Sequence, residues 1–163
     1  MKSLITTLAL LVVAQNAMAG ELIIGQGFAS GPRGTDAKSL YSQAKLEVAT
    51  HFPANAFKQI SRWSTWIAAV GSESYVGAEA SFVDINDSGP YLISTTENRV
   101  WARNKAEIPE FVELSKERAL SKAKFFCNSE VTQVLPWDVK LTPKDGFQEA
   151  EDIEVTSRFL CKQ

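Results

Sequence analysis

Two stretches of this chain carry similar residues at matching positions, and each is expected to form a helix followed by a strand. This repetition constrains the fold more than any other feature of the sequence. The two stretches span residues 38–63 and 108–137. Shifting the first by 74 positions, so that residue 52 meets residue 126, gives six identities, at positions 40, 46, 49, 52, 59 and 63. A shared pattern at fixed spacing is typical of repeated structural units. We therefore predict an internal duplication with pseudo-repeats at about residues 22–86 and 91–163.

The first 19 residues have the features of a secretory signal peptide. Lys2 supplies a positive charge, residues 4–14 are apolar, and residues 17–19 (Ala-Met-Ala) fit a cleavage site. The apolar stretch is shorter than the roughly 18 residues that span a bilayer. We expect residues 20–163 to form a single exported domain, periplasmic or secreted, with no transmembrane segment.

Charge and composition narrow the classes of partner. Without Lys2, 16 of the 17 basic residues remain against 19 acidic ones, and no run of like charges occurs. A polyanion such as nucleic acid would find no electrostatic attraction. We therefore predict no nucleic-acid partner, and expect another envelope protein or a glycan, with a homodimer also open.

The only two cysteines, Cys127 and Cys161, predict one disulfide, because thiols pair in the oxidising compartments that exported proteins reach. A reactive thiol or a metal-binding pair is the alternative, but no third ligand stands nearby. His51 is the single histidine, and no Gly-x-Ser-x-Gly motif occurs. We predict no catalytic residue, no metal site and no cofactor.

The first half is expected to contain three strands and one helix. Thr35 or Asp36 can cap the helix, and Pro53 ends it. The segment after it fits either a strand or a helix, and its likeness to residues 131–137 favours a strand. The expected elements are a strand at 22–29, a turn at 31–34, a helix at 37–52 and strands at 57–70 and 76–85.

The second half repeats this order after a break at residues 86–90. It is expected to have an extended segment at 91–103, a helix at 109–127, a strand to Leu141 and a last strand at 153–161. Each half is then strand–helix–strand–strand. The predicted class is α+β, with the helices on one face of a mainly antiparallel sheet and one disulfide.

Side chains alternate between the two faces of a strand, so parity predicts which residues meet the helices. In the last strand Cys161 shares the apolar face with Phe159, which turns it toward the helix that carries Cys127. In the strand before it, the residues expected to face the helices are Val131, Leu135, Trp137, Val139 and Leu141.

Two motifs imitate ligand sites. Gly25-x-Gly27 follows an apolar strand as in dinucleotide-binding loops, but the turn at 31–34 delays the helix that such a loop should open. We interpret these glycines as allowing close packing of the strand. Residues 84–89 match half of a calcium loop, yet Thr95 occupies the position of its bidentate Glu, so we expect a turn.

The strand with Gly25-x-Gly27 is followed by a capped helix with alanines at helical spacing (Ala37, Ala44 and Ala49) and by two strands, all behind a signal peptide. This order resembles small bacterial envelope modules of the flagellar-assembly N-terminal type. The resemblance covers the first half and, more weakly, the second. It implies a non-catalytic envelope module that contacts other proteins.

Parity also points to a binding face. Trp63 and Trp66 are three apart and must face opposite ways on one strand, so a core position for Trp63 leaves Trp66 on the bare face. Tryptophan and arginine are enriched at binding hot spots. We predict a binding face formed by Arg62, Trp66, Arg99, Trp101, Arg103 and Arg158. The expected function is a protein-interaction or scaffold module; a small exported enzyme such as a hydrolase, or a small-ligand carrier, is the alternative.

Overall fold

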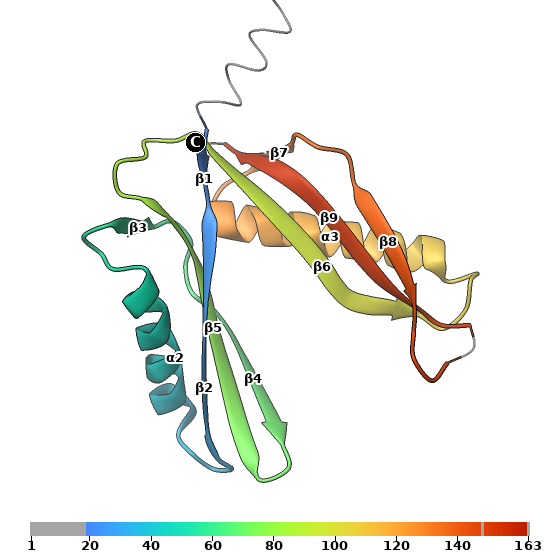
Figure 1. Cartoon of the computed structure of the whole chain (residues 1–163), viewed down its shortest axis with the longest axis horizontal. Coiled ribbons are helices and arrows are strands. Elements are labelled where there is room, and N and C mark those ends of the chain that lie inside the picture. The colour runs from blue at the N-terminus through green and yellow to red at the C-terminus, as the bar shows by residue number, and fades with distance from the viewer. Residues whose placement is uncertain (1–18, 148, 163) are drawn as a thin grey trace, which may run out of the picture.

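The computed structural model describes residues 19–147 and 149–162, so the predicted signal peptide lies outside the described residues except for Ala19. In the described part, the chain is α+β as predicted, with helices packed on mainly antiparallel sheets (Figure 1). The elements are β1 (Gly20–Glu21), β2 (Ile23–Pro32), α2 (Ala37–His51), β3 (Phe57–Gln59), β4 (Ser64–Val70), β5 (Glu73–Asp84), β6 (Tyr91–Ala102), α3 (Ile108–Cys127), β7 (Val131–Gln133), β8 (Asp138–Pro143) and β9 (Glu151–Cys161). None of the helices described has the length and apolar character needed to cross a membrane.

The strands form two sheets, one in each half of the chain. In the first sheet β5 is central. One of its edges pairs with β2, and the other pairs with β3 near one end of β5 and with β4 along the rest. In the second sheet β9 is central. One of its edges pairs with β6, and the other pairs with β7 near one end of β9 and with β8 near the other end. Strand β1 adds to β6 in parallel. Each sheet carries one helix on one face, and the two sheets diverge from the junction of β1 and β2 (Figure 1).

The two sheets also match in detail. In each sheet a strand-end glutamine lies opposite a phenylalanine of the central strand, and a tryptophan four residues later packs edge-on against that phenylalanine. The ring centroids are 6.2 Å apart in the first sheet and 5.7 Å apart in the second. The residues are Gln59, Phe82 and Trp63 in the first sheet and Gln133, Phe159 and Trp137 in the second.

Asp36 caps the N-terminus of α2, and its carboxylate accepts a hydrogen bond from the backbone N–H of Ser39 at 3.0 Å. Its buried stripe contains Ala44 and Val48, which lie over β2. A side chain at Gly27 would place its Cβ 2.2 Å from the backbone oxygen of Ala44. The glycine therefore allows the close packing of helix on strand that the sequence indicated.

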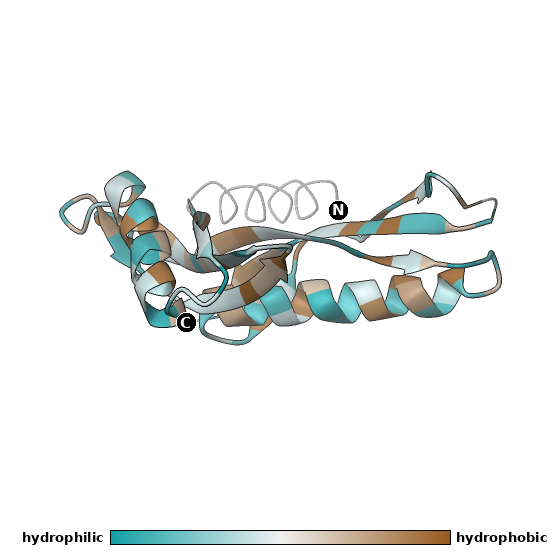
Figure 2. Ribbon diagram, turned by 90° about the horizontal axis from the view of Figure 1, so that it is seen from below, coloured by the Kyte–Doolittle hydropathy of each residue, from teal (hydrophilic) through white to brown (hydrophobic). Residues whose placement is uncertain are grey.

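The last turn of α3 joins the two sheets. Phe126 and Cys127 lie in one buried cluster with Phe159 of the second sheet and with Val83 of the first. The hydroxyl of Ser81 donates a 2.6 Å hydrogen bond to the carbonyl of Phe126. Figure 2 shows α3 extending along one side of its sheet away from this junction.

The predicted disulfide between Cys127 and Cys161 is present, with Cα atoms 5.4 Å apart. It ties the end of α3 to the end of β9, where Phe159 and Cys161 are buried on the helix-facing side as parity predicted. Two independent expectations, the pairing of the thiols and the register of the last strand, therefore agree in one place.

Several local expectations were wrong. The segment 57–70 is extended, as favoured, but it breaks between β3 and β4, and the predicted strand 131–141 breaks between β7 and β8 in the same way. Pro32 belongs to β2 instead of a turn. Leu135 lies in the second break, and Leu135, Val139 and Leu141 are exposed, because α3 covers β6 and β9 but not the outer strand.

Candidate functional site

The face of the first sheet that α2 leaves uncovered carries a row of aromatic side chains. Phe28 of β2 and Trp66 of β4 both lie opposite Gly77 of the central strand. Their ring centroids are 5.8 Å apart, and Phe28 is 56% exposed and Trp66 39% exposed. A Cβ at Gly77 would come within 2.3 Å of the indole, so the tryptophan ring lies directly on the sheet.

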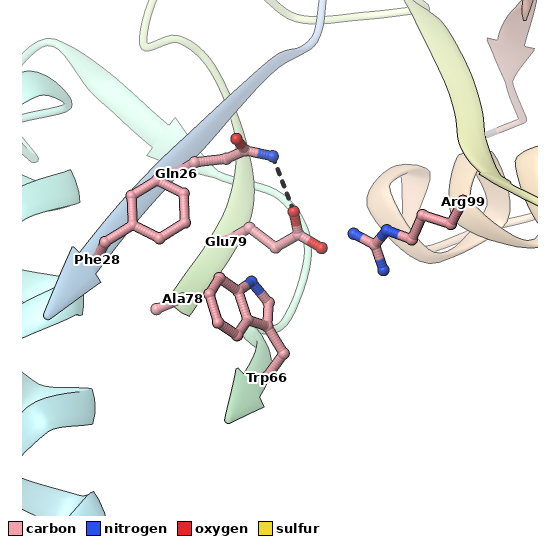
Figure 3. A pocket seen from close by; sticks show the side chains of 6 residues that line it. All are labelled: Gln26, Phe28, Trp66, Ala78, Glu79 and Arg99. Atoms are coloured by element: carbon pink, nitrogen blue, oxygen red, sulfur yellow. Dashed lines mark hydrogen bonds between the residues drawn. The ribbon is translucent and has the colours of Figure 1, made fainter. Parts of the chain in front are cut away.

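Polar groups occupy the next row of the same face. Gln26 of β2 lies opposite Glu79 of β5, and its side-chain amide donates a 3.0 Å hydrogen bond to the Glu79 carboxylate. Figure 3 shows this pair beside the Trp66 ring. One row farther along the sheet, Ser81 is already buried against α3. The exposed part of the face therefore ends at a wall formed by the second half.

Arg99 reaches this face from the second half. It lies in an irregularity of β6, where the register with β9 shifts between Glu97 and Val100. Such bulges re-aim side chains at the edge of a sheet. The Arg99 guanidinium points toward the Glu79 carboxylate across the open space in Figure 3. Among the described residues, its side chain has no hydrogen bond or ion pair.

These side chains line an open cavity of about 450 Å³, formed by Gln26, Phe28, Trp66, Ala78, Glu79 and Arg99. A second hollow of about 280 Å³ shares Glu79 and Arg99 and continues along α3 past Ser121, Lys122 and Phe125. We call the two together the inter-half groove. A larger hollow of about 600 Å³ near Lys105 and Glu149 has no aromatic ring among its lining residues.

The charges in the inter-half groove are balanced. Glu79 and Glu97 supply two carboxylates, and Arg99 and Lys122 supply two cations. Glu97 is buried, and one of its oxygens accepts a 3.0 Å hydrogen bond from the backbone N–H of Arg99. This bond fixes the irregular turn of β6 from which the Arg99 side chain departs.

The structure brings together only Trp66 and Arg99 of the six predicted binding residues. Arg62 is exposed in the break between β3 and β4, where strand parity does not apply. Arg103 follows β6 and donates its backbone N–H to Glu107. Neither of these two arginines lines the groove.

Trp101 and Arg158 lie on the outer face of the second sheet, away from α3. The Trp101 ring is 5.6 Å from that of Phe147, and the Lys144 ammonium lies 5.2 Å from its centroid. Arg158 forms an ion pair with Glu21 at 3.3 Å. The six predicted residues are thus divided between the two sheets, and the structure does not bring them together in one continuous surface.

Sequence reasoning missed Gln26, Phe28 and Glu79. A signal was available for the first two, because they alternate with Gly25 and Gly27, whose close packing under α2 turns their neighbours to the opposite face. Nothing in the local sequence could place Arg99 beside them. That position depends on the bulge in β6 and on how the two sheets meet.

One carboxyl group outside the groove, that of Glu130, has a shifted pKa. The ion pair with Lys124 at 2.7 Å lowers the pKa of the exposed Glu130 carboxyl below its ordinary value. Glu130 thus pairs with the basic residue in the last turn of α3. Within the described residues, no group of three or more His, Cys, Asp or Glu side chains could hold a metal ion.

Comparisons of the chain with known protein families, with curated proteins and with solved structures gave no match. The groove therefore has to be interpreted from its own geometry and chemistry.

Proposed function

We propose that this chain is an exported, non-catalytic interaction module of the bacterial envelope, and that its partner binds in the inter-half groove. One observation carries the proposal: Trp66 and Phe28 lie exposed side by side, next to an arginine with no partner among the described residues. Large aromatic rings and arginine dominate binding energy at interfaces because they offer rigid contact area and directed donors.

The support beneath these rings favours binding. Trp66 lies on Gly77, and the backbone N–H of Phe28 donates a 2.5 Å hydrogen bond to the Glu47 carboxylate of α2. The last turn of α3, which forms the wall of the groove opposite these rings, is attached to the first sheet by the hydrogen bond from the Ser81 hydroxyl to the Phe126 carbonyl. A surface that is ordered before the partner arrives loses less conformational entropy on binding.

Export and envelope location are part of the proposal. They are supported by the signal-peptide pattern of residues 1–19 and by the disulfide, which is typical of oxidising compartments. The resemblance to flagellar-assembly N-terminal modules points the same way. An internal duplication would account for the matching strand order of the two sheets. The partner would be another envelope protein or a glycan.

A carrier of a small ligand is the second candidate. The 450 Å³ cavity lies within the range of about 300–1,000 Å³ that is usual for small-molecule sites. A carrier should retain its ligand through purification. Mass spectrometry of the purified mature protein under native conditions would detect a bound molecule, and this outcome would favour the carrier over the interaction module.

A capture experiment tests the proposal. The mature chain, residues 20–163, serves as bait in envelope extract of the source organism, beside the double variants W66A/F28A and W101A/F147A. The second variant is a matched control, because Trp101 and Phe147 form a similar exposed pair, 5.6 Å apart, outside the groove. We expect W66A/F28A to lose the captured partner and the control to keep it. Equal capture by both variants would contradict the proposal.

A further inference from the structure

Resting on this proposed function, we infer that the ligand of the inter-half groove is an uncharged saccharide chain. One sugar ring stacks on the indole of Trp66, and its hydroxyl groups bond to Gln26, Glu79 and Arg99. The chain continues past Glu97 and Lys122 into the hollow beside α3. Four features of the groove favour this chemistry over other ligands.

The first feature is the flat aromatic platform. The indole of Trp66 rests on Gly77, which leaves its opposite side toward the cavity. The face of an aromatic ring is electron-rich and attracts groups with a positive edge. The C–H bonds on one face of a pyranose ring carry partial positive charge, so a sugar ring and an indole stack face to face.

The second feature is the kind of polar group beside the platform. Gln26 uses one amide hydrogen for Glu79, which leaves its amide oxygen and the second Glu79 oxygen as acceptors. Arg99 adds several N–H donors that are not engaged within the described part of the chain. Each sugar hydroxyl is both a donor and an acceptor. A mixed set of acceptors and donors at the rim of an aromatic ring therefore suits neighbouring hydroxyl groups.

The third feature is the charge balance. The two carboxylates, Glu79 and Glu97, stand against two cations, Arg99 and Lys122. A polyanion would be repelled by the carboxylates, and a polycation by the guanidinium and the ammonium. A neutral polar ligand meets neither penalty.

The fourth feature argues against a peptide strand added at the β2 edge. Extended peptides bind sheet edges through their backbone groups. At the β2 edge of this cavity, the N–H of Phe28 is already bonded to Glu47. An incoming strand would have to displace that carboxylate. A ligand that binds on the face of the sheet leaves this bond intact.

Proton–nitrogen NMR of the mature protein tests the inference, with cellohexaose, maltohexaose and N-acetylchitohexaose as probes and hyaluronan fragments as an acidic comparison. The indole N–H signals of Trp63, Trp66, Trp101 and Trp137 serve as four reporters in one spectrum. We expect a neutral oligosaccharide to shift the Trp66 signal and the Arg99 Nε–H signal saturably, and to leave Trp101 unmoved. Absence of any Trp66 shift with the neutral probes at millimolar concentration overturns the inference, as does a response to hyaluronan alone.

Variants separate stacking from folding. Trp66→Ala should raise the Kd for the responsive oligosaccharide at least about tenfold, whereas Trp66→Phe keeps an aromatic platform and should lose less. Arg99→Ala should weaken binding, while the proton–nitrogen NMR spectrum of the unbound variant should remain that of the folded protein. Trp101→Ala is the matched control and should leave the Kd within about twofold. An equal loss in Trp66→Ala and Trp101→Ala would count against stacking on Trp66.

The two proposals fail in different ways. If W66A/F28A loses its captured partner but no saccharide shifts the Trp66 signal, the saccharide inference is wrong and the interaction module stands, with a protein as its partner. If the variant captures as well as the wild type and no saccharide binds, both are wrong.

Discussion

At the scale of single residues, two glycines shape the first sheet, because the missing side chain of each leaves room for a neighbouring group. Gly27 lets α2 approach β2, and Gly77 lets the indole of Trp66 lie on the sheet. Both glycines act by leaving space that a Cβ would fill, and they serve opposite faces of the same sheet. One face is thereby closed by the helix and the other carries an aromatic platform.

We expect Gly27→Ala to lower the free energy of unfolding by about 1–3 kcal/mol, as overpacking typically does. The new Cβ would meet the backbone oxygen of Ala44 at 2.2 Å, which only a shift of the whole helix can relieve. Gly25→Ala is the matched control, because its Cβ would meet the side chains of Val48 and Phe52 at 2.8 Å. Urea denaturation of both variants measures the difference. A larger loss in Gly25→Ala than in Gly27→Ala would refute this account.

At the scale of elements, a bulge in β6 and the breaks before β4 and β8 determine which side chains line the inter-half groove. The bulge of β6 sends Arg99 toward the first sheet. The breaks before β4 and β8 restart the alternation of side chains, so that Arg62 falls outside any strand. The disulfide then fixes the end of α3, whose last turn forms the wall of the groove.

Removal of the disulfide should cost roughly 3–4 kcal/mol of stability on the chain-entropy model, because it closes a loop between residues 34 positions apart. The double variant C127S/C161S avoids a leftover thiol and should melt at a lower temperature than the oxidised protein. Reduction should lower the melting temperature of the wild type and leave the variant unchanged. An equal response of both proteins to reductant would show that the bridge does not stabilise the fold.

At the scale of the whole molecule, two similar sheets share one buried cluster, and each sheet has a further cluster under its own helix. Leu22 and Val83 of the first half lie in the same buried cluster as Phe126 and Phe159 of the second. Neither half can bury these residues alone. The angle between the two sheets, and with it the width of the groove, is set by this shared packing.

The shared core predicts that both halves unfold together. In a urea titration followed by NMR, the indole signals of Trp63 in the first half and Trp137 in the second should disappear at one midpoint, because the buried cluster that both halves share couples their unfolding. Phe126→Ala should lower that midpoint for both signals by the same amount. Two separate midpoints in the wild type would mean that the halves are independent domains.

The sequence alone determined the features that depend on short-range pattern and covalent chemistry. The capped helix from Ala37, the alternation of the last strand and the pairing of Cys127 with Cys161 all follow from the spacing of a few neighbouring residues. Trp63 packs on the core cluster under α2 as expected, but it lies in the break before β4, so strand parity is not the reason for its position.

Only the tertiary structure decided which of these residues meet. Parity assigns a face along an unbroken strand, but it carries no information across a break or a bulge, or between two sheets. It therefore grouped Trp101 and Arg158 with Trp66, although they lie on another sheet, and it could not bring Arg99 of β6 to Glu79 of β5. The groove exists because the last turn of α3 packs against both sheets, and such long-range packing is not written in any local pattern of the chain.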